Sequence, residues 1–157
     1  MNKKLALFSL FIFLLIVAVP IVTTGETLVI DEGKAWGYHY SVTKDQDTFT
    51  WEIGHQDVQT NIIENKDNSE DLLHFRTAIN DIQTNTFSLI ISSSYLFLVL
   101  MLPLFLLKIN KKTDMISVGI ITVFALGGLF FIVTNSFALN SSIQDANFYY
   151  SILMDRI

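Results

Sequence analysis

Three histidines and a group of carboxylates between residues 26 and 81 are the side chains in this sequence that could do chemistry. A neutral histidine beside a carboxylate can begin a metal site or form a pH-sensitive contact. The pattern of apolar residues on two predicted strands places His39 opposite Glu52 on their polar face. A metal ion needs further ligands at fixed geometry, and neither His55 nor His74 has a spacing that supplies them. We therefore expect a solvated cross-strand pair, with no metal site and no cofactor.

Motifs of catalysis are missing from the sequence as well. The chain contains no cysteine, no glycine-rich phosphate loop, no nucleophile elbow and no zinc-binding helix pattern. Its two long apolar segments, 87–107 and 115–138, contain no charged residue and no histidine, so proton relays within a membrane have no groups to use. We expect no catalytic residue and predict that the protein is not an enzyme.

An aromatic cluster is the remaining candidate for recognition. Five aromatic residues fall on one face of the predicted strands: Trp36, Tyr38, Tyr40, Phe49 and Trp51. The simplest interpretation is that this face is the core of its own domain. About sixty residues without a disulfide make a marginal domain, so burial against a helix, a membrane surface or a second protein would stabilise it. We therefore treat these residues as a candidate interaction face.

A predicted β-hairpin positions the aromatic residues. Alternating apolar residues indicate strands at 35–42 and 48–53, joined by a four-residue loop at 44–47. One register aligns three apolar pairs, and a slip of one residue would destroy it. In that register Val42 lies opposite Phe49, Tyr40 opposite Trp51, and Tyr38 opposite Ile53.

Two shorter strands and a helix complete the predicted domain, residues 26–86. The strands are expected at 26–30 and 58–62, with turns at 31–33 and 54–57. Asn68 or Ser69 is expected to cap an amphipathic helix whose apolar residues recur at helical spacing: Leu72, Phe75, Ile79 and Ile82. This helix either covers the sheet or continues into the next apolar segment, and Thr84–Thr86 favours a break between them.

Two apolar segments, 87–107 and 115–138, are each long enough to cross a bilayer. The linker 108–114 is too short to cross back, so we predict an antiparallel transmembrane hairpin. Small residues let the backbones of membrane helices approach closely. Folding about the linker places Ser94 opposite about Gly128, and Ser94, Gly127 and Gly128 are therefore predicted to pack the two helices together.

The distribution of charge predicts the orientation of the hairpin. Residues 26–81 carry twelve acidic and four basic residues, a net charge of −8. Lysines cluster instead at the N-terminus and in the linker: Lys3, Lys4, Lys108, Lys111 and Lys112. Short flanks rich in lysine remain in the cytoplasm. We thus expect the N-terminus and the 108–114 loop inside, and residues 26–86 and the C-terminus outside the cell membrane.

The two ends of the chain leave alternatives open. Residues 1–25 fit either a cleaved signal peptide or an uncleaved transmembrane helix, and both place residue 26 outside. The tail, 139–157, has apolar residues at helical spacing, and it either lies on the membrane surface or packs under the outer domain.

These expectations define the predicted fold class, an α+β membrane protein. It has an N-terminal signal or anchor helix, a small extracytoplasmic β-meander with an amphipathic helix, and a transmembrane helical hairpin. We expect a small multi-pass protein that acts by protein interaction in the cell envelope, as an accessory, regulatory or immunity-type subunit. The alternative is an oligomeric channel or transporter component. Its expected partners are the lipid bilayer and either an envelope protein or further copies of the chain, and its acidic domain disfavours nucleic acid.

Overall fold

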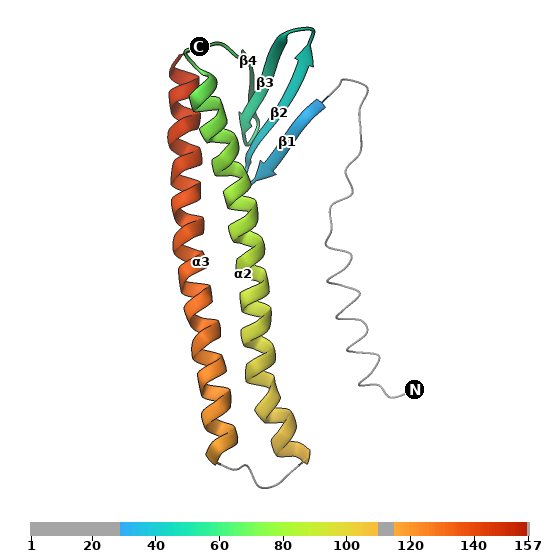
Figure 1. The fold of residues 1–157 in the computed structure, drawn as a ribbon, viewed down its shortest axis with the longest axis vertical. Coiled ribbons are helices and arrows are strands. Elements are labelled where there is room, and N and C mark those ends of the chain that lie inside the picture. The colour runs from blue at the N-terminus through green and yellow to red at the C-terminus, as the bar shows by residue number, and fades with distance from the viewer. Residues whose placement is uncertain (1–28, 110–114, 157) are drawn as a thin grey trace, which may run out of the picture.

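A computed structural model describes residues 29–109 and 115–156 of the chain, with side chains in 29–101 and 118–156 (Figure 1). The predicted N-terminal helix or signal peptide, 1–25, and most of the basic linker lie outside the described residues. The elements in chain order are β1 (Val29–Ala35), β2 (Tyr38–Asp45), β3 (Thr48–His55), β4 (Val58–Ile63), α2 (Ser69–Ile109) and α3 (Met115–Asp155).

The four strands form one antiparallel sheet in the order β1-β2-β3-β4, which confirms the predicted meander. The predicted register of the central hairpin is wrong by two residues. Val42 pairs with Trp51, Tyr40 with Ile53, and Tyr38 with His55. The reason is a two-residue turn in place of the expected four-residue loop. Because the shift is an even number of residues, the side chains within β2 and β3 keep their predicted faces.

Tight turns with positive φ connect the strands. Gln46 and Gln56, each followed by an aspartate, adopt φ of 53° and 56°, and Trp36–Gly37 adopts 52° and 88°. Such angles at the start of a two-residue turn match the right-handed twist of a hairpin. The predicted turns at 31–33 and 54–57 are therefore misplaced, because residues 31–33 continue β1 and Gly54 and His55 belong to β3. The structure also places a bulge between Val29 and Asp31.

The N-terminal part of α2 packs against one face of the sheet, and the C-terminal part of α3 packs beside it (Figure 1). The four apolar residues predicted for an amphipathic helix are fully buried in this layer: Leu72, Phe75, Ile79 and Ile82. Leu139, Ala146 and Leu153 of α3 are buried in the same core. The predicted helix therefore covers the sheet.

Neither long helix is interrupted. α2 continues through Thr84–Thr86, where a break was favoured, and α3 continues through residue 139 to Asp155. Tertiary hydrogen bonds satisfy the polar residues at these places, since the Asn85 amide donates to the Ser142 hydroxyl over 3.0 Å. Contacts with α2 recur every seven positions along α3, at Gly128, Asn135, Ser142 and Tyr149. A second series with the same spacing is buried or half-buried: Ile132, Leu139, Ala146 and Leu153.

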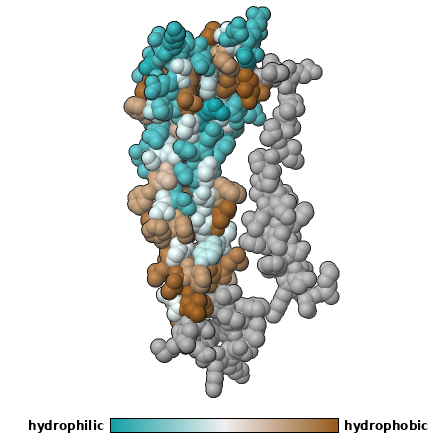
Figure 2. Space-filling model, viewed as in Figure 1, coloured by the Kyte–Doolittle hydropathy of each residue, from teal (hydrophilic) through white to brown (hydrophobic). Residues whose placement is uncertain are grey.

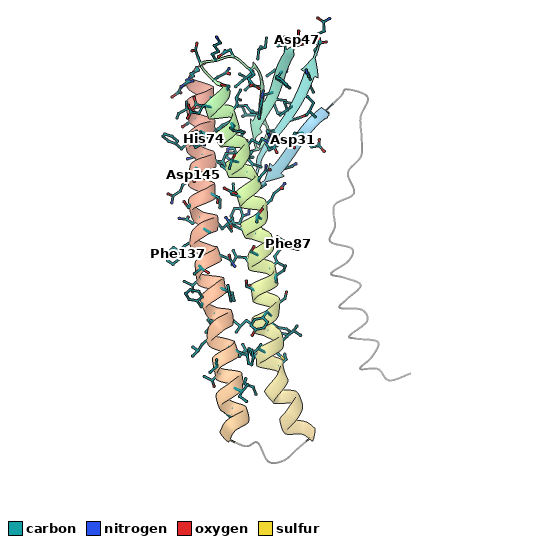
Figure 3. All side chains as sticks on the ribbon, viewed as in Figure 1. Asp31, Asp47, His74, Phe87, Phe137 and Asp145 are labelled. Carbon is teal, nitrogen blue, oxygen red and sulfur yellow. The ribbon has the colours of Figure 1, made fainter. Side chains whose placement is uncertain are left out.

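The surface of the molecule is polar at the end that contains the sheet and mostly apolar along the two helices (Figure 2). Both helices are long and apolar enough to cross a membrane, and almost nothing in their most apolar segments is buried within the molecule. Large apolar side chains stand exposed on α2 from Phe87 to Met101 and on α3 from Val118 to Phe137. We call this surface the apolar belt. The sheet and the ends of both helices beyond the belt carry the polar residues (Figure 3).

Candidate functional site

The five aromatic residues of the candidate interaction face occupy different environments. Tyr38, Tyr40 and Trp51 are 5%, 2% and 6% exposed beneath the helices, and the partly buried Phe49 packs at the edge of this core. The Tyr38 ring meets Phe75 edge-on, with 6.2 Å between the centroids. Trp36, which was expected on the same face, lies in the β1–β2 turn and is 60% exposed. The buried residues serve the core, and a role in binding remains a prediction for the exposed members.

A polar cluster closes the β1 side of the core. The Tyr40 hydroxyl lies 3.2 Å from Asp31 and 3.1 Å from the Asn80 side chain. Arg76 forms an ion pair with the same aspartate. Burial raises the pKa of Tyr40, so its hydroxyl stays protonated and remains a hydrogen-bond donor at neutral pH. This cluster fixes β1 to α2 and forms one wall of the groove described next.

A groove opens between the sheet and the first turns of α2, at the end of the molecule away from the apolar belt. Its volume is about 560 Å³, within the usual range of ligand sites. The lining combines apolar and charged side chains: Ile30, Asp31, Val42, Phe49, Trp51, Glu64, Ser69, Glu70, Leu73 and Arg76. We call it the distal groove. Three carboxylates and one guanidinium give it a net negative charge.

Two polar contacts involve the aromatic residues on the floor of the distal groove. The Trp51 indole donates to the Glu64 carboxylate over 2.8 Å, and the Lys44 ammonium lies 5.3 Å from the centre of the Phe49 ring. A second hollow of about 320 Å³ shares Phe49, Glu64 and Ser69 with the groove and extends it toward the β2–β3 turn. Leu73 forms the opposite wall and is 52% exposed. Leu73 therefore adds exposed apolar surface to a groove that also carries acidic groups.

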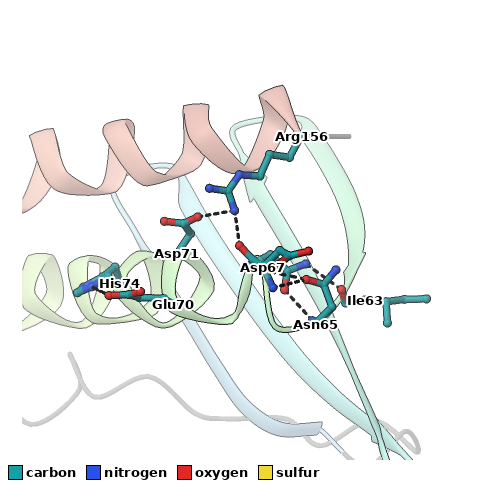
Figure 4. A network of polar contacts seen from close by, with 8 residues as sticks. Ile63, Asn65, Asp67, Glu70, Asp71, His74 and Arg156 are labelled. Atoms are coloured by element: carbon teal, nitrogen blue, oxygen red, sulfur yellow. Dashed lines mark hydrogen bonds and ion pairs between the residues drawn. The ribbon is translucent and has the colours of Figure 1, made fainter.

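A network of polar contacts ties the ends of α2 and α3 together beside the groove (Figure 4). The Arg156 guanidinium lies 2.8 Å from Asp71 and donates to the carbonyl oxygen of Asp67. The Asn68 amide donates to the Ile63 carbonyl over 2.9 Å. The loop that joins β4 to α2 is thereby fixed to the last turn of α3.

The histidines do not form the contact expected from the sequence. His39 pairs with Gly54 and Lys34 on the neighbouring strands, and Glu52 pairs with Ser41 and Asn61. The predicted His39–Glu52 pair is wrong because it depended on the incorrect register. Among the residues that the structure describes, no group of three or more metal-ligating side chains comes together.

Neither family models, nor curated proteins, nor solved structures show a match to this chain. The distal groove and the apolar belt are therefore the features from which a function can be argued.

The residues predicted to pack the helices together are only partly in contact. A Cβ atom at Gly128 would lie 3.1 Å from the Tyr95 ring and 3.4 Å from Leu96, whereas one at Gly127 would meet open space. The predicted partner of Gly128, Ser94, is the residue next to Tyr95 and is half-buried. Two residues before Ser94, Ser92 accepts a hydrogen bond across the interface from the Asn135 amide over 3.2 Å. Asn135 was missed because the sequence argument considered only small residues.

Proposed function

We propose that this protein is a small membrane-anchored interaction subunit of the cell envelope. α2 and α3 cross the bilayer through the apolar belt, with the basic linker in the cytoplasm and the sheet outside. The distal groove binds a segment of a partner protein that presents an apolar side chain next to a basic one. In this role the protein is an accessory, regulatory or immunity-type subunit and carries out no catalysis.

The apolar belt is the observation that carries the membrane part of the proposal. Its residues are exposed around both helices, and a surface of this extent is stable in contact with lipid or another protein. At 1.5 Å per residue, the predicted segment 87–107 is about 30 Å long, which equals the hydrocarbon thickness of a bilayer. The orientation is supported by the lysines of the N-terminus and the linker.

The chemistry of the distal groove supports the binding part. Its apolar floor and the exposed Leu73 fit an apolar side chain, and burial of such a chain contributes about 1.5–3 kcal/mol. Asp31 is already paired with Arg76, so Glu64 and Glu70 are the carboxylates that would attract a basic neighbour. Charge complementarity of this kind selects partners and speeds their association.

The alternative of an oligomeric channel receives less support from the contacts between the helices. Asn135 pairs with Ser92, and the hydroxyls of Thr122, Thr134 and Ser136 bond to carbonyl oxygens of their own helix. Among the described side chains, the Asn135–Ser92 pair therefore serves helix packing, and the three hydroxyls use their donor group on the local backbone.

Two measurements test the proposal. The chain has no cysteine, so single cysteines can report topology. In intact cells an impermeant thiol reagent should label Asp47→Cys in the β2–β3 turn and should not label Asn110→Cys in the linker. Labelling of Asn110→Cys alone would reverse the orientation and remove the groove from the outside.

The second measurement tests the groove by site-specific photo-crosslinking in native membranes. A photoreactive phenylalanine analogue at Leu73 should cross-link to one partner, and the same analogue at the exposed Gln59 on the opposite face of the sheet should not. Glu70→Lys should weaken the Leu73 cross-link, because it replaces an attractive charge with a repulsive one. Equal cross-linking at both positions, or none at Leu73, would contradict a role for the groove.

A further inference from the structure

Trp36 is an exposed residue in an unfavourable backbone conformation. It lies in the β1–β2 turn with φ of 52° and is 60% exposed. A bulky non-glycine residue at positive φ is a conformational outlier that costs of the order of 1 kcal/mol or more. In water its large apolar ring would also remain unburied, which forfeits the usual gain from burying an aromatic side chain. Gln46 and Gln56 have nearly the same φ in the other two turns, so the backbone angle belongs to the turn itself. The exposed ring is the feature that points to a surface outside the molecule.

The position of Trp36 indicates which surface this is. Its indole Nε1 donates to the Thr86 hydroxyl over 3.1 Å, and Thr86 directly precedes Phe87, the first exposed residue of the apolar belt on α2. Phe137, 73% exposed, ends the belt on α3 at the same level of the helix pair (Figure 3). Exposed polar residues follow on both helices beyond this level. Trp36 therefore lies where the surface changes from apolar to polar.

Tryptophan prefers this boundary in membrane proteins, because its ring is apolar and its N–H group needs a polar partner. We propose that the Trp36 indole inserts into the interfacial region of the bilayer that the two helices cross. The β1–β2 turn is then a lipid-docking foot of the outer domain, with phospholipid as its partner. The bond to Thr86 holds the ring beside α2, and the exposed Lys34 lies two residues away, near the phosphate level.

The chain provides its own control, since Trp36 and Trp51 are its two tryptophans. Trp51 is buried and pairs with Val42, six residues along the chain from Trp36, which corresponds to about 20 Å along a strand. Insertion of the foot would place Trp36 at the lipid interface and Trp51 well above it. The inference rests on the proposed crossing of the membrane by α2 and α3, so the test has to separate the two.

The experiment measures tryptophan fluorescence of the full-length protein in phosphatidylcholine vesicles, with Trp51→Phe and Trp36→Phe as single-tryptophan variants. Lipids brominated near the headgroup end of the acyl chain should lower Trp36 emission by at least about twofold, and lipids brominated near the methyl end should lower it less. Trp51 emission should change little with either lipid. If Trp51→Phe does not fold, the difference between the wild type and Trp36→Phe gives the Trp36 signal.

Flotation of the vesicles separates failure of the inference from failure of the proposed function. Protein that floats with the vesicles and resists alkaline extraction, with Trp36 unquenched by either lipid, would overturn the docking foot and leave the membrane crossing intact. Trp36 shielded from aqueous acrylamide but not quenched by lipid would also overturn it, in favour of a protein contact. Protein that fails to float would contradict the membrane crossing itself.

Discussion

The amide of Asn135 in α3 donates a hydrogen bond to the hydroxyl of Ser92 in α2, across the interface between the two apolar segments. The Ser92 hydroxyl in turn donates to the carbonyl oxygen of Ser88 over 2.8 Å. The side chains of Asn135 and Ser92 are both half-buried in the interface between the helices. Within the proposed membrane this pair fixes the rotation and the relative height of the helices, because an unpaired amide in lipid is unfavourable.

We predict that Asn135→Ala lowers the free energy of unfolding in micelles by about 0.5–1.5 kcal/mol. Ser136→Ala is the matched control, since the exposed Ser136 hydroxyl bonds to the carbonyl oxygen of Ile132 in its own helix. A double-mutant cycle of Asn135→Ala with Ser92→Ala should show coupling of the same order. Additive effects of the two substitutions would mean that the bond contributes nothing to helix association.

Adjacent glycines of α3 should respond very differently to a large side chain. Gly128→Leu drives its side chain into the Tyr95 ring and should destabilise the helix pair by about 1–3 kcal/mol. Gly127→Leu points into open space and should be nearly neutral. Thermal unfolding in detergent micelles distinguishes the two. Similar losses of stability from both variants would show that Gly128 does not lie closer to α2 than Gly127 does.

The outer face of the sheet contains a contact between a glycine and a ring. The His39 imidazole covers Gly54 on β3, where an added Cβ atom would collide with it and with the carbonyl oxygen of Val58. Gly54→Ala should therefore lower the melting temperature by several degrees, since an overpacked site costs about 1–3 kcal/mol. His39→Ala should recover part of that loss in the double variant. If the double variant recovers no stability, the collision with the carbonyl oxygen of Val58 accounts for the loss in Gly54→Ala.

The ion pair of Arg156 with Asp71 should stabilise the end of the helix pair modestly. Arg156→Ala removes this pair and the bond to the Asp67 carbonyl, and solvent screening limits the expected cost to about 1 kcal/mol. The exposed neighbour Asp155 gives the control, Asp155→Ala. The difference in melting temperature between the variants should shrink in high salt. A difference independent of salt would assign the effect to the backbone bond.

Two buried tyrosines predict a loss of stability in alkali. Burial raises the pKa of Tyr38 above its ordinary value of 10.0, with a smaller contribution from Tyr150, and burial likewise raises the pKa of Tyr40. The unfolded chain therefore ionises first, so this stability is complete below pH 10.0 and declines as the pH rises beyond it. Tyr38→Phe should flatten the fall of melting temperature between neutral and alkaline pH. An unchanged slope would contradict this assignment.

The alternation of apolar residues was enough to predict the two central strands and their buried face, whereas the first strand was predicted at 26–30 and lies at Val29–Ala35. Tyr38, Tyr40 and Trp51 lie on that face as expected, because side-chain direction depends on the parity of position alone. The register was not predictable in the same way. Gln46 and Gln56 adopt positive φ without being glycine, so a search for glycine at hairpin turns misses both. The Gln-Asp pair at residues 46–47, repeated at 56–57, was the sequence signal for these two turns.

The continuity of the helices was also beyond local sequence rules. Thr84–Thr86 has the composition of a break, yet Asn85 bonds to Ser142 and Thr86 to Trp36, both remote in sequence. The distal groove depends on the same kind of contact, since its walls come from β1, β3 and α2. From the sequence alone, Leu73 and Glu70 are ordinary exposed residues of a helix. They become part of a groove only because the sheet packs beside α2.

The unbroken course of α2 makes the molecule a spacer of fixed length. From Thr86, at the proposed lipid boundary, to Ser69, in the wall of the distal groove, the helix rises by about 25 Å. Under the proposed function, a partner would have to present its binding segment at about that height above the bilayer. In that case a protein lying flat on the lipid could not reach the groove, and a soluble protein would have to come within this distance of the membrane. The length of the helix would then contribute to the choice of partner in addition to side-chain chemistry.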